Sequence, residues 1–104
     1  MSQGIFCQIQ AGTLPASVVY QDEQAMVILD LFPIREAHCL VIPKTPCRNL
    51  LDASTEQLAS VIAVTQKVAR AVKEAFDAGG VTIQQFNETD GGQEVFHLHF
   101  HILP

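Results

Sequence analysis

The chain has 104 residues, of which 48% are hydrophobic and 16% charged, a balance typical of a globular protein and not of a disordered one. Six Lys and Arg stand against 11 Asp and Glu, for a net charge of −5. Because no basic stripe interleaved with aromatic residues is present, this charge argues against nucleic-acid binding through phosphate neutralisation. The length predicts a single domain over residues 1–104.

The first half of the chain predicts a short helix followed by three strands. Apolar residues in 5–11 have helical spacing, and Gly12 is expected to end that helix. Residues 17–22 and 25–32 predict two strands joined as a hairpin, and residues 38–43 predict a third strand.

The second half predicts a long helix and two more strands. Ser54 begins an amphipathic helix that runs from about residue 55 to residue 76. Apolar residues recur along it at spacings of 3, 4 and 7: Leu58, Val61, Ile62, Thr65, Val68, Ala69, Val72 and Phe76. Strands follow at 81–87 and 94–103. This order predicts an α+β fold, with a five-stranded antiparallel sheet covered by the long helix.

The cysteines and the first residues predict a cytoplasmic protein. Cys7, Cys39 and Cys47 are odd in number and form no CxxC pair, which fits a reducing compartment better than a disulfide scaffold. The first ten residues lack the basic region and long apolar run of a secretory signal. No stretch approaches the roughly 18 apolar residues of a membrane span.

Three of the four histidines occupy alternate positions in the last ten residues, "VFHLHFHILP". On a strand, His97, His99 and His101 would share one face. The apolar residues among them would share the other face, beneath the long helix: Phe96, Leu98, Phe100 and Ile102.

Three interpretations of this histidine row remain open from the residues alone. A solvated strand face is one, although such faces more often carry Thr, Lys, Glu or Ser. A zinc site is another, because His-x-His on a strand presents two nitrogens to one side. Nucleophilic or acid–base chemistry is the third, because imidazole titrates near neutral pH and forms covalent phosphoryl adducts.

The segment "HLHFHIL" matches the pattern His-φ-His-φ-His-φ-φ, with φ apolar, of the histidine triad (HIT) family. Residues 5–44 resemble the N-terminal half of that family, and residues 91–104 resemble its active-site strand. The chain looks most like the Hint branch, with the Fhit-like dinucleoside polyphosphate hydrolases as the next relatives. The resemblance implies a HIT-like fold, a homodimer, and hydrolysis of a purine nucleoside phosphoramidate or mixed AMP anhydride. AMP or a related nucleoside monophosphate would be released, and no cofactor would be needed.

In this family the middle histidine, here His99, attacks the α-phosphate and forms a nucleotidyl-histidine that water then hydrolyses. The chemistry is sensible because a neutral imidazole is a competent nucleophile near neutral pH. The resemblance implies that His97 and His101 fix the ring tautomer and donate hydrogen bonds to phosphate oxygens or the leaving group. His38, otherwise an isolated histidine at a strand end, matches the residue that supports the first triad histidine. We therefore expect it beside His97, across the sheet.

The resemblance also implies a nucleoside pocket. Asp30 matches the acidic residue that accepts from the ribose hydroxyls, although an aspartate there could be only a turn former. The base would lie among apolar residues that could equally be plain core: Ile5, Phe6, Ile9, Leu14 and Leu31.

The phosphate would lie against the loop before the histidines. Family members place a glutamine, here Gln93, near the bridging atom, and Asn87 resembles an asparagine that contacts phosphate. Glycines at 91 and 92 allow close approach, so the amides around Glu94 and Val95 could cradle phosphate oxygens. The loop over 87–93 is one residue shorter than the usual Hint loop.

Two departures from relatives affect the expected chemistry. Gly4 and Pro46 stand where some bacterial relatives have zinc ligands, which leaves Cys7 alone, so no metal is predicted. Glu94 stands where eukaryotic Hint proteins commonly have serine, and its carboxylate would disfavour an acidic leaving group. The alternatives to a phosphoramidate hydrolase are a dinucleoside polyphosphate hydrolase or nucleotidyl transferase, and a catalytically weak nucleotide-binding module.

Overall fold

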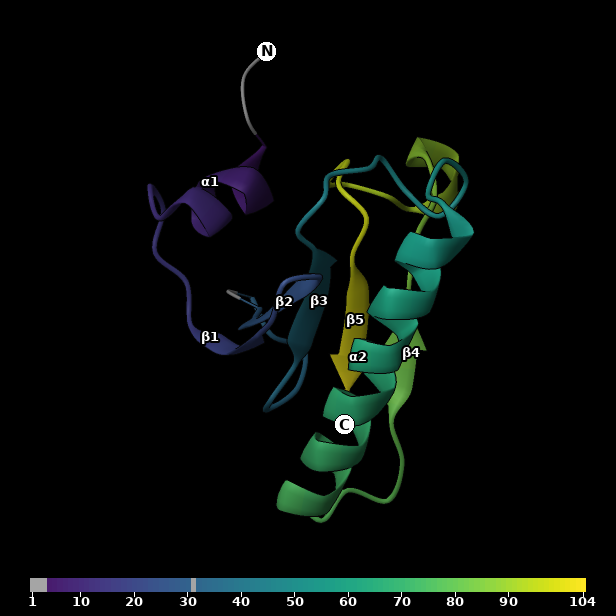
Figure 1. Cartoon of the computed structure of the whole chain (residues 1–104). Helices are drawn as coiled ribbons and strands as arrows, with labels where there is room; N and C mark the ends of the chain where they lie inside the picture. Colours follow the sequence, from purple (N-terminus) through teal and green to yellow (C-terminus); the bar gives the residue numbers. More distant parts are fainter. Residues whose placement is uncertain (1–3, 31) are drawn as a thin grey trace.

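The computed structural model describes residues 4–30 and 32–104. Five strands form one antiparallel sheet in the order β1-β2-β3-β5-β4 (Figure 1). The strands span β1 Val18–Gln21, β2 Ala25–Leu29, β3 Cys39–Pro43, β4 Thr82–Gln84 and β5 Phe100–Leu103. The helices are α1 Ile5–Ala11, α2 Thr55–Ala75 and the short 3₁₀ helix η1 Thr89–Gly91. The predicted α+β fold, with a five-stranded antiparallel sheet, one long helix and a short N-terminal helix, is confirmed.

The two faces of the sheet carry separate apolar clusters. On one face, strand residues pack against Val61, Val64 and Val68 of α2: Ala25, Val27, Cys39, Val41, Phe100 and Ile102. On the other face, the alternate residues of β2 and β3 pack against Phe6 and Ile9 of α1: Met26, Ile28, Leu40 and Ile42. Because both faces of β2 and β3 are covered, these strands are almost continuously apolar in sequence.

Helix α2 lies along the sheet and begins where the sequence predicts (Figure 1). The Ser54 hydroxyl accepts a hydrogen bond from the Gln57 amide at 3.0 Å, which caps the first turn. The buried stripe differs in part from the expected one, since Val64 is buried whereas Ile62 and Phe76 are each 48% exposed. Among the described residues, no helix is both long and apolar enough to cross a membrane.

The two C-terminal strands are shorter than predicted. Strand β5 begins at Phe100, and the preceding residues leave the ladder, with the Leu98 amide donating to the Cys47 carbonyl at 2.8 Å. Side chains still alternate there, because Leu98 is buried in the α2-facing cluster. Phe96 does not reach that cluster. It is 42% exposed and lies under the Arg48 guanidinium, 4.4 Å from the ring centroid.

Ala37, immediately before His38, has a φ of 62°, a left-handed conformation that its Cβ disfavours. We expect Ala37→Gly to raise the free energy of unfolding by about 1 kcal/mol, because glycine removes the steric cost. Urea denaturation measures the change. Ala59→Gly, on an exposed position of α2, is the matched control and should lower stability by about 1 kcal/mol. A loss of stability in both variants would contradict the assigned strain.

Candidate active site

A cavity of about 510 Å³ opens on the α1-facing side of the sheet. Its walls combine apolar side chains of α1, β2 and β3 with polar groups of β5 and of the segment leading to it. Of the predicted base-pocket residues, Ile5, Phe6 and Ile9 line the cavity, whereas Leu14 packs against the cluster behind it. Leu31 lies outside the described residues.

Aromatic rings form a continuous row along this cavity. His99 makes edge contacts with Phe6 and with His101, each at 5.0 Å between ring centroids. His101 in turn meets Phe86 at 5.8 Å. These contacts hold the two imidazoles in the cavity wall between an α1 ring and a ring that follows β4.

His99 is oriented by a hydrogen bond to a nearby main-chain carbonyl. Its Nδ1 lies 2.7 Å from the His97 carbonyl oxygen. Because a carbonyl only accepts, this nitrogen carries the proton, and Nε2 of the neutral ring keeps a lone pair. Burial lowers the pKa of His99, so the ring stays neutral near pH 7. The ring therefore has the tautomer that a nucleophilic Nε2 requires.

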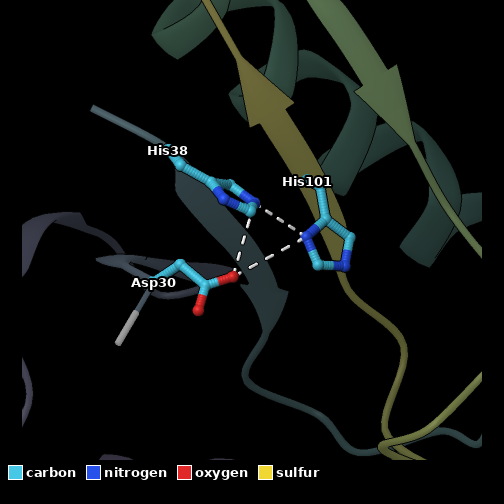
Figure 2. Close-up of side chains that lie close together, drawn as sticks. All are labelled: Asp30, His38 and His101. Carbon is cyan, nitrogen blue, oxygen red and sulfur yellow. Dashed lines mark hydrogen bonds and ion pairs between the residues drawn. The ribbon is translucent and has the colours of Figure 1, made fainter. Parts of the chain in front are cut away.

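His101 is oriented by a chain of hydrogen bonds that begins at the main-chain amide of Ile34 and reaches His101 through His38. Figure 2 shows His38 and Asp30 beside His101. The Ile34 N–H donates to His38 Nδ1 at 3.2 Å, which leaves the proton of neutral His38 on Nε2. This Nε2 lies 3.0 Å from His101 Nδ1 and 3.4 Å from Asp30 Oδ2. His101 thus accepts at Nδ1 and carries its own proton on Nε2.

The charge state of His101 follows from its surroundings. Burial, together with the neighbouring His99 and His38, lowers the pKa of His101 to about 4, against the opposing effect of Asp30. His101 is consequently neutral at pH 7, and its Nε2–H is a hydrogen-bond donor that is retained over a wide pH range.

The expectation that His38 lies beside His97 was wrong. The register pairs Leu40 with His101, which brings His38 to the third histidine and places the first one near Pro43. His97 is 5% exposed, donates from Nε2 to the Pro43 carbonyl at 3.0 Å, and does not line the cavity. Its Nδ1 lies 3.9 Å from Cys7 Sγ.

Asp30 is both a turn former and a group of the site. Its Oδ1 accepts from the Phe32 amide at 3.0 Å, and its Oδ2 faces His38 and His101 (Figure 2). The ligand-type atoms of Asp30, His38 and His101 lie within 4.8 Å of one another, so this triplet could be considered for a metal ion. The bond from Ile34 argues against that use, because His38 Nε2 would have to give up its proton before it could ligate.

Gln93 lines the cavity, but its amide is fully engaged by the protein. Its oxygen accepts from Asn49 Nδ2 at 3.0 Å and from the Glu88 amide at 2.8 Å. Its nitrogen donates to the carbonyls of Arg48 at 2.7 Å and Val95 at 3.0 Å. With all four hydrogen bonds made and only 4% exposure, Gln93 ties the loop before the histidines together and has no group left to contact a bound molecule.

Asn87 is not brought to the cavity. Its Oδ1 accepts from the Leu50 amide at 2.9 Å, and its side chain exchanges two hydrogen bonds with Gln85. Gly92, Glu94 and Val95 do line the cavity. Gly92 has a φ of 94°, and a Cβ there would approach the Phe86 ring at 3.1 Å, so the loop needs glycine at this position.

Sequence reasoning missed several residues that line the cavity, among them Phe32, Ile34 and Phe86. Phe32 and Ile34 line the cavity although they are 87% and 69% exposed, and Phe86 lies against His101. Ile34 fixes the tautomer of His38 through its main-chain N–H. No side-chain signal could have identified it, because every residue except proline carries this donor.

We expect nitrogen-15 spectra at pH 7 to show His99 protonated on Nδ1, and His38, His97 and His101 protonated on Nε2. The reason is that His38, His97 and His99 each have one nitrogen facing a main-chain N–H or carbonyl. For His101 the partner is His38, whose own tautomer is fixed in this way. Long-range proton–nitrogen correlation distinguishes the tautomers, and single-histidine variants assign the signals. A His99 ring protonated on Nε2 would contradict the assignment.

The chain is similar to known proteins in both sequence and fold. The family model for the HIT domain matches residues 11–104. "Protein hit" of Bacillus subtilis is 38% identical over 100 residues, which cover 96% of this chain and 69% of that protein. The structure of a Hit-like protein from Bartonella henselae, described as involved in cell-cycle regulation, is 48% identical with a TM-score of 0.95, over 98% of this chain and 79% of that one. A HIT family hydrolase from Legionella pneumophila is 32% identical with a TM-score of 0.87, over 98% of this chain and 92% of that one. This chain belongs to the HIT family.

Proposed function

We propose that this protein is a Hint-like hydrolase that cleaves the P–N bond of purine nucleoside phosphoramidates, or the corresponding bond of a mixed AMP anhydride. The observation that carries the proposal is the 2.7 Å bond from His99 Nδ1 to the His97 carbonyl, because it leaves Nε2 as an unprotonated nucleophile. The name of the Legionella relative, a HIT family hydrolase, supports the reaction class.

The reaction proceeds in two displacements at one phosphorus. His99 Nε2 forms a bond to phosphorus as the P–N bond breaks, and the departing amine takes a proton from water. A second water then attacks, the P–Nε2 bond breaks, and the nucleoside monophosphate leaves as a proton returns to solvent. One water is consumed in total, and one amine and one monophosphate such as AMP are formed.

The neighbouring groups stabilise the charge that develops. Phosphorylated His99 is an imidazolium, and the His97 carbonyl already accepts from its Nδ1–H. The Nε2–H of His101 donates to a phosphoryl oxygen or to the leaving nitrogen. His38 acts on His101 by holding Nδ1 as an acceptor, and it is therefore a positioning residue.

The remaining cavity residues bind the nucleotide. Oδ2 of Asp30 accepts from the ribose, and the apolar residues of α1 and β2 enclose the base. The main-chain amides of Glu94 and Val95 contact phosphate oxygens, on a loop that Gln93 holds in place.

We also propose that the protein works as a cytoplasmic homodimer. Apolar side chains that remain exposed on α2, at its C-terminal cap and on the edge strand β4 support self-association: Ile62 and Phe76 at 48%, and Ile83 at 44%. Burying these side chains in a dimer would increase the buried apolar surface area, which is limited in a single chain of this size.

We expect wild-type protein to release AMP from adenosine 5′-phosphoramidate, and His99→Ala to lose at least about a thousandfold of that rate, since covalent capture is then impossible. EDTA should leave wild-type release unchanged. Chromatography of the released AMP gives the rate, and calorimetric AMP binding by the variant is the control for folding. A wild type that binds AMP without cleavage would favour the binding module, whereas faster cleavage of a diadenosine polyphosphate would favour that hydrolase class.

The pH dependence has a predicted sign. Protonation removes the Nε2 lone pair, so kcat/KM should fall as pH decreases through the pKa of His99. Because burial lowers this pKa, the acidic limb should have its midpoint below the ordinary histidine value of about 6.5. A kcat/KM profile from pH 4.5 to 8, with circular dichroism at each pH as the folding control, measures it. A midpoint at or above the ordinary value would oppose this assignment.

A further inference from the structure

The ionisable side chains that line the cavity are carboxylates and imidazoles, with no Lys or Arg among them. Its ionisable lining residues are Asp30, Glu94, His38, His99 and His101. None of the six Lys and Arg of the chain, all within the described residues, lines it. Because His99 and His101 are neutral at pH 7, the fixed charge of the cavity comes chiefly from the two carboxylates.

Arg48 and Arg35 are engaged in contacts outside the cavity. Arg48 makes two hydrogen bonds to the Glu88 carboxylate, at 2.8 and 2.9 Å, and covers the Phe96 ring. Arg35 donates to the Pro104 carbonyl at 3.4 Å. Using either guanidinium to neutralise the cavity would therefore break an existing contact.

The carboxylates of Asp30 and Glu94 differ in whether the protein provides hydrogen-bonding or charged partners for them. Both oxygens of Asp30 have partners, with Oδ1 on the Phe32 amide and Oδ2 facing His38. Glu94 is exposed, lines the cavity, and makes no hydrogen bond or ion pair with any residue in the described part of the chain. Glu94 is consequently the uncompensated charge of the site.

We propose that Glu94 selects the leaving group by charge, so that the preferred substrate is a phosphoramidate whose amine carries a second, cationic ammonium group. This rests on the proposed function and specifies its substrate. The free carboxylate of Glu94 repels an anionic leaving group and attracts an ammonium group. The cavity provides no Lys or Arg that would compete with the ammonium for this carboxylate. The distal ammonium stays protonated throughout and takes no part in bond making, so the two displacements are unchanged.

The test uses three adenosine 5′-phosphoramidates whose amines have equal length and end in an ammonium, a hydroxyl or a carboxylate. We expect wild-type kcat/KM to decrease in that order, with the ammonium compound favoured over the carboxylate compound by at least about tenfold at low salt. In Glu94→Gln, which keeps the shape and removes the charge, this ratio should approach one. Glu56→Gln, an exposed acid outside the cavity, should leave the ratio unchanged.

Binding of the same three compounds to His99→Ala, with and without Glu94→Gln, is measured in parallel by calorimetry. The same charge order in affinity, removed by Glu94→Gln, would support the selection even if no compound were cleaved, in which case only the hydrolase proposal would fail. Cleavage of all three by wild type at equal kcat/KM would overturn the charge selection and leave the hydrolase proposal standing. A gradient that persists in Glu94→Gln would show that another group sets it.

Discussion

The antiparallel register of β3 and β5 is the constraint on which both the core and the site depend. Pairing Leu40 with His101 directs Val41, Phe100 and Ile102 toward α2, and the opposite face then carries the histidines beneath α1. A slip of one residue would move the histidines into the α2 cluster and expose the apolar row. The same strand pairing therefore specifies both the apolar core and the placement of the imidazoles. Burial of the core side chains stabilises this register, and with it the geometry of the site.

Within that frame, backbone groups decide what each imidazole can do. The His97 carbonyl holds the proton of His99 on Nδ1, and the Ile34 amide, acting through His38, holds the proton of His101 on Nε2. Two chemically identical side chains consequently differ, one having a free lone pair and the other a free donor. Main-chain groups suit this purpose because they cannot change their own protonation, so the assignment is stable across the physiological pH range.

Most of the fold could be predicted because its signals are local or periodic. The capped helix α2, the hairpin of β1 and β2, and the side-chain alternation around His99 all follow from spacing and from turn residues. The exact strand ends could not, since the loss of ladder bonds before Phe100 depends on a hydrogen bond from Leu98 to Cys47, 51 residues away in sequence. The buried position of Val64 also escaped, because the choice of helix face depends on where the sheet lies.

By itself the sequence determined the alternation that directs His99 and His101 to one side and Leu98, Phe100 and Ile102 to the other, and membership of a family through a specific motif. Only the tertiary structure decided the partners of these residues. His38 contacts His101 and not His97. The side-chain amide of Gln93 is fully hydrogen-bonded to Asn49 and to main-chain groups. The physical reason is that residue spacing sets direction along one element, whereas partner choice across elements is set by register and loop path, which depend on the packing of the whole chain.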